Sequence, residues 1–130
     1  AEFGLEFRAG LVFEGDIDYK DGIASADRLL DTHTQATAVV AAADILAIGA
    51  QKAFYERGVR VPEDISLMGF DDLEVSQYLT PGLTTVRQQI STKGEKAVEL
   101  LIRNIEEPEL TKQELILPVT LVERGSVRKI

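Results

Sequence analysis

The sequence predicts an α/β fold in which helices flank a parallel sheet. Three short apolar runs, at residues 11–16, 37–44 and 65–72, each end in an acidic residue. Their apolar residues are continuous rather than alternating, which is typical of strands buried on both faces. Two segments with helical periodicity lie between the runs. The order strand, helix, strand, helix, strand implies parallel strands joined by right-handed crossovers.

The composition narrows the class of protein. Of the 130 residues 45% are hydrophobic, which is enough to form the core of one domain. No apolar run reaches the roughly eighteen residues that a membrane span requires, so we expect no membrane partner. The chain contains no cysteine, which fits a reducing cytoplasm. It starts at Ala1 in helix-like sequence, so we expect a fragment of a longer protein.

Charge and side-chain chemistry argue against several functions. The net charge of -8 repels a phosphate backbone, so any contact with DNA is expected from another segment. The single histidine, His33, lies in a polar run. Without cysteine or a G-x-S-x-G motif, a nucleophilic triad is not expected. We therefore expect neither an enzyme nor a bound cofactor.

The first helix is expected over residues 22–32 and the second over residues 44–57, where Gly58 supplies a left-handed end. The apolar arc of the second helix is wider than a helix needs in order to cover one face of a sheet. The residues beyond its core face are Ile45, Ile48 and Tyr55. Extra core burial and a subunit interface explain this arc equally well.

The second half of the chain predicts a strand, a helix and a last strand. Residues 83–86 follow a Pro-Gly turn and fit a β-branched strand. Thr92 and Glu95 fit a capping box at the start of a helix that Pro108 ends. The terminal apolar run is interrupted by Pro118, which predicts a break or a sheet edge there.

Four aspartates are expected along one edge of the sheet: Asp16, Asp44, Asp71 and Asp72. The carboxyl ends of parallel strands share an edge, and ligands of open α/β folds bind beside it. Asp16 and Asp72 fit N-caps, whereas Asp44 fits a cap and a ligand-facing role equally. Asp71 is not needed as an N-cap, because one cap requires one aspartate and Asp72 already fits that role. Beside Phe70, Asp71 suits a polyhydroxylated or amine-bearing small molecule.

A Mg²⁺ site is an alternative interpretation of these acids, because a hard cation prefers carboxylate ligands. Such an acidic edge serves phosphoryl transfer, which also uses a lysine or a glycine-rich phosphate loop. The sequence contains neither G-x-x-x-x-G-K-[ST] nor G-x-G-x-x-G. We therefore predict no metal among the site residues.

Two motifs point to a known family. "VPEDISLMGFDD" (residues 61–72) and "PGLTTVRQ" (residues 81–88) occur together. From about residue 11 to residue 126, the chain resembles the effector-binding core of the lactose-repressor (LacI/GalR) family of bacterial transcription regulators. The resemblance implies a periplasmic binding protein-like type I fold, with two α/β subdomains around a ligand cleft. It also implies a small-molecule effector, a homodimer, and DNA contact only through a missing N-terminal helix-turn-helix domain.

The resemblance divides the chain into three parts. Residues 1–87 correspond to the C-terminal effector-binding subdomain without its first strand and helix. Residues 88–117 correspond to a crossover segment that belongs to the N-terminal subdomain, and residues 118–130 to the return. The expected fold is therefore partial and holds mostly the C-terminal subdomain.

The resemblance also implies functional residues. The effector-binding positions are Asp71, which matches the family's effector-binding acid, Gln88, Ile17 and Ala43. Ile17 stands where many members carry an aromatic ring, and Ala43 where many carry an asparagine. Both differences weaken the case for a sugar. The implied dimer interface comprises Ile45, Ile48, Tyr55 and Leu79.

Two alternatives share this fold. One is a periplasmic solute-binding protein, which would use the same cleft for transport. The other is suggested by residues 11–22, "LVFEGDIDYKDG", which resemble the carbon-catabolite regulators of the family. Those regulators respond to a phosphorylated carrier protein, so a phosphocarrier protein is an alternative partner.

Overall fold

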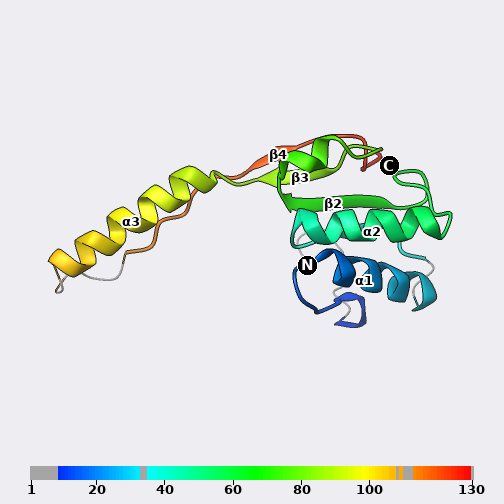
Figure 1. Ribbon diagram of the computed structural model, residues 1–130, viewed down its shortest axis with the longest axis horizontal. Coiled ribbons are helices and arrows are strands. Elements are labelled where there is room, and N and C mark those ends of the chain that lie inside the picture. The colour runs from blue at the N-terminus through cyan, green and yellow to red at the C-terminus, as the bar shows by residue number, and fades with distance from the viewer. Residues whose placement is uncertain (1–8, 33–34, 108, 110–112, 130) are drawn as a thin grey trace.

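The computed structural model describes residues 9–32, 35–107, 109 and 113–129. The body is a four-stranded sheet with two helices on one side, and a third helix extends away from it (Figure 1). Helix α2 (Asp44–Glu56) lies against the sheet, and α1 (Tyr19–Thr32) lies against α2. Among the described helices, none combines the length and the apolar character of a membrane span.

The sheet confirms the predicted α/β class and is mixed rather than wholly parallel. Its strands are adjacent in the order β1 (Ala38–Val40), β2 (Ser66–Asp71), β3 (Thr84–Arg87) and β4 (Thr120–Val122). The first three strands are parallel, and β4 runs antiparallel to β3. Strand β4 begins only after Pro118, which confirms the predicted break at that residue.

The two helices of the body touch through glycines. A Cβ atom at Gly22 would lie 2.3 Å from the carbonyl oxygen of Leu46, and one at Gly49 would lie 2.3 Å from that of Tyr19. Only residues without a side chain allow this backbone approach. The core beside this contact includes Ala26, Leu29, Ala47, Ala53, Phe54, Leu67 and Leu83. Gly58 has a φ of 70°, which confirms the predicted left-handed end of α2.

The predicted strand at residues 11–16 is wrong. The structure has a short 3-10 helix, η1 (Ala9–Leu11), and no strand over residues 12–16. The apolar character of this run has another cause. Phe13 packs against the core, and the Arg28 guanidinium lies 5.2 Å from the centre of its ring. A cavity of about 590 Å³ is lined by both this run and β1, and the run does not join the sheet at that strand.

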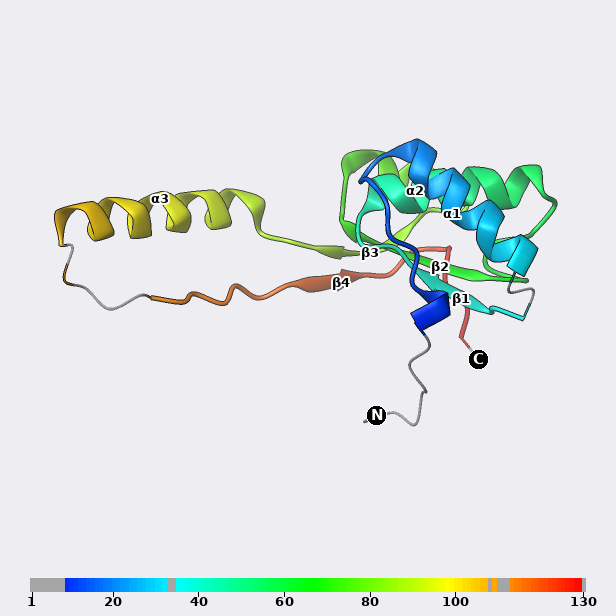
Figure 2. The same ribbon diagram turned by 90° about the horizontal axis from the view of Figure 1, so that it is seen from below.

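A long arm extends from the body (Figure 2). It carries α3 (Ile90–Glu106) and, beside this helix, the returning residues 113–119. The apolar stripe of α3 is exposed along the arm, at Val98, Leu101, Ile102 and Ile105. No residue of the helix is buried, so within the described part of the chain this stripe covers no core.

The predicted capping box of α3 is wrong. The N-cap is Gln89, which makes no side-chain capping bond, and the helix starts before Thr92. The Lys93 N–H donates a 2.8 Å hydrogen bond to the Gln89 carbonyl, and this bond sets the earlier start. At the other end the C-cap is Glu107. The predicted stop at Pro108 lies outside the described residues.

Candidate functional site

Asp71 and Gln88 form the centre of a polar rim where β2 and β3 end. Asp71 is the last residue of β2 and lies opposite Arg87 in the parallel register, so Gln88 follows directly beside it. The Gln88 side-chain amide donates a 2.7 Å hydrogen bond to Asp71 Oδ1. Lys93 Nζ donates in turn to Gln88 Oε1 at 3.2 Å. The rim therefore presents a carboxylate and an oriented amide side by side.

The backbone of this rim lies in a rarely occupied conformation. Asp71 has a φ of 113° and Asp72 a φ of 55°. Residues other than glycine seldom adopt positive φ, although aspartate and asparagine tolerate it better than most. Such strain persists only where surrounding contacts hold it, and it clusters at ligand sites. The two outliers support a functional role for this turn.

A cavity of about 360 Å³ lies at the rim. Its lining consists of Asp71, Asp72, Arg87, Gln88, Gln89, Ile90, Ser91 and Thr92. Carboxylate, amide, guanidinium and hydroxyl groups dominate this lining, and none of these lining residues is aromatic. Such a cavity can exchange hydrogen bonds with hydroxyl or amine groups, but its described lining offers no ring for stacking.

Asp72 does not cap the turn that follows it, so the predicted cap is wrong. Leu73 is the N-cap of the 3-10 helix η2 (Glu74–Gln77) and makes no side-chain capping bond. The Asp72 carboxylate instead accepts 2.6 Å hydrogen bonds from Arg87 Nε and Arg124 Nη2. Burial raises the pKa of Asp72, but the bonds from Arg124 and Arg87 outweigh it and hold the pKa below its ordinary value.

Asp44 is fully buried and has a structural role. It is not the N-cap of α2, because Ala43 occupies that position. Its Oδ2 accepts hydrogen bonds from the Leu73 N–H at 2.8 Å and from Ser76 Oγ at 2.6 Å. Its Oδ1 accepts a hydrogen bond from Thr85 Oγ1. Both oxygens are therefore occupied inside the protein, so Asp44 fills neither the predicted cap nor a ligand-facing role.

The predicted cap at Asp16 is also wrong. Asp18 precedes α1, and its Oδ1 accepts a 2.8 Å hydrogen bond from the Asp21 N–H. Asp16 donates its own backbone N–H to the Asp21 carboxylate. Of the four acids expected along one edge, Asp71 and Asp72 thus line one cavity, whereas Asp44 is buried and Asp16 lies before α1. In the part of the chain that the structure describes, no group of three or more acidic, histidine or cysteine side chains could hold a metal ion.

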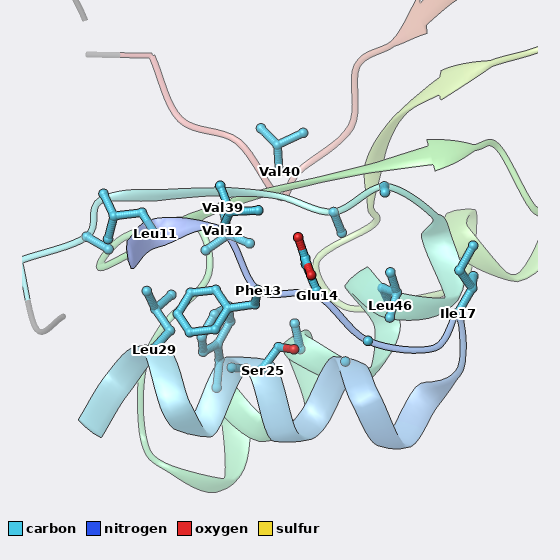
Figure 3. A pocket seen from close by; sticks show the side chains of 18 of the residues that line it. Leu11, Val12, Phe13, Glu14, Ile17, Ser25, Leu29, Val39, Val40 and Leu46 are labelled. Atoms are coloured by element: carbon cyan, nitrogen blue, oxygen red, sulfur yellow. The ribbon is translucent and has the colours of Figure 1, made fainter. Parts of the chain in front are cut away.

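The other cavity, of about 590 Å³, lies between α1, β1 and residues 11–17 (Figure 3). Its lining is mostly apolar and includes Val12, Phe13, Leu29, Val39 and Leu46. Ile17 lines this cavity and not the one at the rim, whereas Ala43 is buried and lines neither. The structure thus joins Asp71 and Gln88 in one cavity and places the other two predicted effector residues elsewhere.

The four residues of the implied dimer interface differ in exposure. Tyr55 is 85% exposed, whereas Ile45, Ile48 and Leu79 are half-buried. The segment between β2 and β3 adds exposed apolar side chains at Leu73, Val75 and Tyr78. All three residues lie within residues 73–79, which the family resemblance also implies as part of the dimer interface. Gln51 of α2 donates a 3.0 Å hydrogen bond to the Pro81 carbonyl, which ties the helix to the end of this segment.

The match to a family model decides the family. The model described as the periplasmic binding protein-like domain covers residues 2–127. The chain belongs to the periplasmic binding protein-like domain family. This membership confirms the fold that the sequence resemblance implied.

The relatives of this periplasmic binding protein-like domain are bacterial repressors. The ribose operon repressor of Escherichia coli (strain K12) is 37% identical over 123 residues, which are 95% of this chain and 37% of that protein. The transcriptional repressor PurR of Mannheimia succiniciproducens is 36% identical over 130 residues, which are 100% of this chain and 39% of that protein. The chain therefore spans well under half the length of these curated relatives.

Solved structures give the same result. The transcription regulator CcpA of Lactococcus lactis is similar with a TM-score of 0.86 and 34% identity, over 98% of this chain and 46% of that one. A LacI family transcriptional regulator from Enterococcus faecium with bound ribose is similar with a TM-score of 0.76 and 34% identity, over 88% of this chain and 42% of that one. These regulators and repressors are not enzymes, and they confirm the resemblance to the LacI family.

Proposed function

We propose that this periplasmic binding protein-like domain is part of the effector-binding domain of a LacI-type transcriptional regulator, with Asp71 and Gln88 as effector ligands. The observation that carries the proposal is the 2.7 Å hydrogen bond between these two side chains in the cavity at the rim. Asp71 belongs to the body and Gln88 to the start of the arm. A ligand that bridges them would contact both parts at once.

A small hydroxylated molecule is the ligand class that suits the rim. The Asp71 carboxylate can accept hydrogen bonds from neighbouring hydroxyls, and the Gln88 amide can both donate and accept. Because the described lining lacks an aromatic ring, affinity would come from hydrogen bonds rather than from stacking. The similarity to a regulator with bound ribose supports a monosaccharide as the first probe.

Effector binding would act through the arm. In this proposal residues 1–87 and 118–130 form one subdomain, and residues 88–117 belong to a second one that would cover the exposed stripe of α3. A ligand held by Asp71 and Gln88 favours one arrangement of the two subdomains. A difference in affinity between two arrangements is sufficient for allosteric control. DNA would be contacted by a separate helix-turn-helix domain, because the net charge of -8 repels phosphate.

The regulator would act as a homodimer in the bacterial cytoplasm. Tyr55 and the exposed apolar residues after β2 supply a surface of the type found at subunit interfaces. Ile45, Ile48 and Leu79 would pack at the base of that surface. The periplasmic transport alternative and the phosphocarrier partner stay predictions, and the first is distinguished by a secretion signal in the full-length protein.

The test uses the full-length protein, a DNA fragment from its own promoter region, and calorimetric titration with ribose and a panel of other monosaccharides. Asp71→Asn keeps the size of the side chain and tolerates positive φ. It should lower effector affinity by about tenfold or more, because a hydrogen bond to a charged group is lost. DNA binding without effector should be unchanged. Asp16→Asn is the matched control, and loss of DNA binding in Asp71→Asn alone would assign Asp71 a structural role.

A further inference from the structure

We propose that Asp72 is a positioning residue of the effector site, which ties both strands of the arm to the body and thereby fixes the direction of Asp71. The inference rests on the proposed function of Asp71. It does not require Asp72 to touch the effector. Its basis is the contacts that Asp72 makes with β3, with the segment after β4, and with the turn at the rim.

One carboxylate connects the two strands that enter and leave the arm. Asp72 Oδ2 accepts a 2.6 Å hydrogen bond from Nε of Arg87, the last residue of β3 before the arm. Asp72 Oδ1 accepts a 2.6 Å hydrogen bond from Nη2 of Arg124, which follows β4 on the way back. The outgoing and the returning strand are thus tied to the same point at the end of β2. We call these three residues the arm clamp.

The two halves of the arm clamp differ in burial. The Asp72 side chain is 7% exposed and that of Arg124 is 18% exposed, whereas Arg87 is 58% exposed. An exposed ion pair is weakened by solvent and salt, so the bond to Arg124 is expected to be the stronger half. Arg124 is also held independently of Asp72. Its Nη1 donates a 2.7 Å hydrogen bond to the Leu83 carbonyl, and its backbone N–H donates to Thr84 Oγ1 at 2.9 Å.

The clamp acts on Asp71 through the backbone. Asp71 and Asp72 are consecutive residues with positive φ, a conformation that costs free energy and must be held by contacts. The Asp72 side chain is fixed by the two arginines, and its N–H lies 3.4 Å from Thr85 Oγ1. The next N–H, that of Leu73, donates to the buried Asp44. With the residues after it held in this way, the Asp71 side chain is directed towards Gln88.

The arm clamp also explains how ligand binding at Asp71 and Gln88 would change the position of the arm. Gln88 follows Arg87 directly, so the residue that bonds Asp71 and the residue that bonds Asp72 are neighbours on the outgoing strand. Two adjacent acids at the end of β2 therefore hold the last residue of β3 and the first residue of the arm. A change at the Asp71–Gln88 contact is expected to alter the strand that the clamp anchors.

The experiment measures arm position and Gln88 contact without any ligand. The chain contains no cysteine, so Glu63→Cys on the body and Glu99→Cys on α3 provide defined spin-label positions within it. In the full-length protein, Asp72→Asn should broaden the distance distribution between these labels. It should also shift the Gln88 side-chain amide resonance, observed with ¹⁵N-glutamine, towards the value of a solvated amide. Arg124→Met should act in the same way, and Arg124→Lys should restore part of the wild-type distribution.

Arg57→Met is the matched control, because Arg57 bridges the exposed acids Asp27 and Asp31 between α1 and α2, away from the arm. It should change neither measurement. The inference is overturned if Asp72→Asn lowers the unfolding midpoint while both measurements keep their wild-type values. If Asp72→Asn does not fold, the exposed Arg87→Met decides, and an unchanged distance distribution in that variant also overturns the inference. Neither measurement uses an effector, so a failure of sugar binding would affect the proposed function alone.

Discussion

The Asp44 carboxylate and the Ser76 hydroxyl form a 2.6 Å hydrogen bond between two fully buried side chains that are 32 positions apart in sequence. The same carboxylate accepts hydrogen bonds from the Leu73 N–H and from Thr85 Oγ1. It therefore connects α2, the turn after β2, and β3. Thr85 also accepts a hydrogen bond from the Asp72 N–H, and Leu73 follows Asp72 directly, so the position of the proposed effector site depends on this connection.

Asp44→Ala is expected to destabilise the fold strongly. The substitution leaves two hydroxyls and one backbone N–H without their acceptor in a buried site, and each unsatisfied group costs about 1–3 kcal/mol. We expect a loss of about 3–5 kcal/mol in the free energy of unfolding, measured by urea titration of the full-length protein. Asp16→Ala, at an exposed acid, should change it by less than about 0.5 kcal/mol. Equal effects of the two variants would contradict the structural role of Asp44.

Substitution by alanine is expected to have opposite effects on stability at a glycine in the contact between α1 and α2 and at a glycine in α3. In Gly49→Ala the new methyl group would lie 2.3 Å from the Tyr19 carbonyl oxygen, a backbone atom that cannot move without separating the helices. We expect a loss of stability of about 1–3 kcal/mol. Gly94→Ala, in α3, meets no atom within 4 Å and should stabilise the helix by about 0.5–1 kcal/mol. Thermal unfolding followed by circular dichroism measures both changes, and their opposite signs are the test.

Much of the body could be predicted from local patterns. The apolar runs at residues 37–44 and 65–72 contain β1 and β2, and the helical periodicity located α1 and α2. The prediction of a strand at residues 11–16 was wrong because apolar residues alone do not determine a partner strand. Phe13 of this run packs against the core although residues 12–16 form no strand. An apolar run thus predicts burial more reliably than it predicts a strand.

The roles of the acids could not be predicted in the same way. Asp44 bonds Ser76 and Thr85, which are 32 and 41 positions away, and Asp72 bonds Arg124, which is 52 positions away. Nothing local to an aspartate indicates which distant hydroxyl or guanidinium reaches it. The local rule for N-caps therefore gave the wrong function for both acids. Asp71 was singled out because it had no cap to supply, and the structure places it beside Gln88.

The exposed aromatic ring on α2 predicts a dependence of self-association on one residue. Tyr55 is 85% exposed, and Tyr55→Asp would place a charge in the proposed dimer interface. We expect a higher dissociation constant for the dimer of the full-length protein, so that the variant is monomeric at concentrations at which the wild type is dimeric. Analytical ultracentrifugation measures this change. Tyr19→Asp, at a ring that is 47% exposed at the start of α1, is the control and should leave the dimer intact. An unchanged dimer in Tyr55→Asp would exclude this surface.

The arm clamp predicts a defined pH dependence of stability. Because the pKa of Asp72 is lowered in the folded protein, the clamp stabilises the fold fully above the pKa of the unfolded chain, about 3.9. This stabilisation is lost as the pH falls through the lowered pKa of the folded state. Asp72→Asn lacks the titrating group, so it should be less stable than wild type by about 2 kcal/mol at pH 7.

The difference between Asp72→Asn and wild type should shrink steadily below about pH 4, as urea unfolding at a series of pH values would measure. Asp64 provides the comparison, because its hydrogen bonds from Arg60 lower its pKa to about 2 although the pair is exposed. Asp64→Asn should follow the same pH direction with a smaller effect at every pH, since solvent screens an exposed pair. A difference for Asp72→Asn that stayed constant from pH 7 to pH 3 would mean that its carboxylate charge does not hold the clamp.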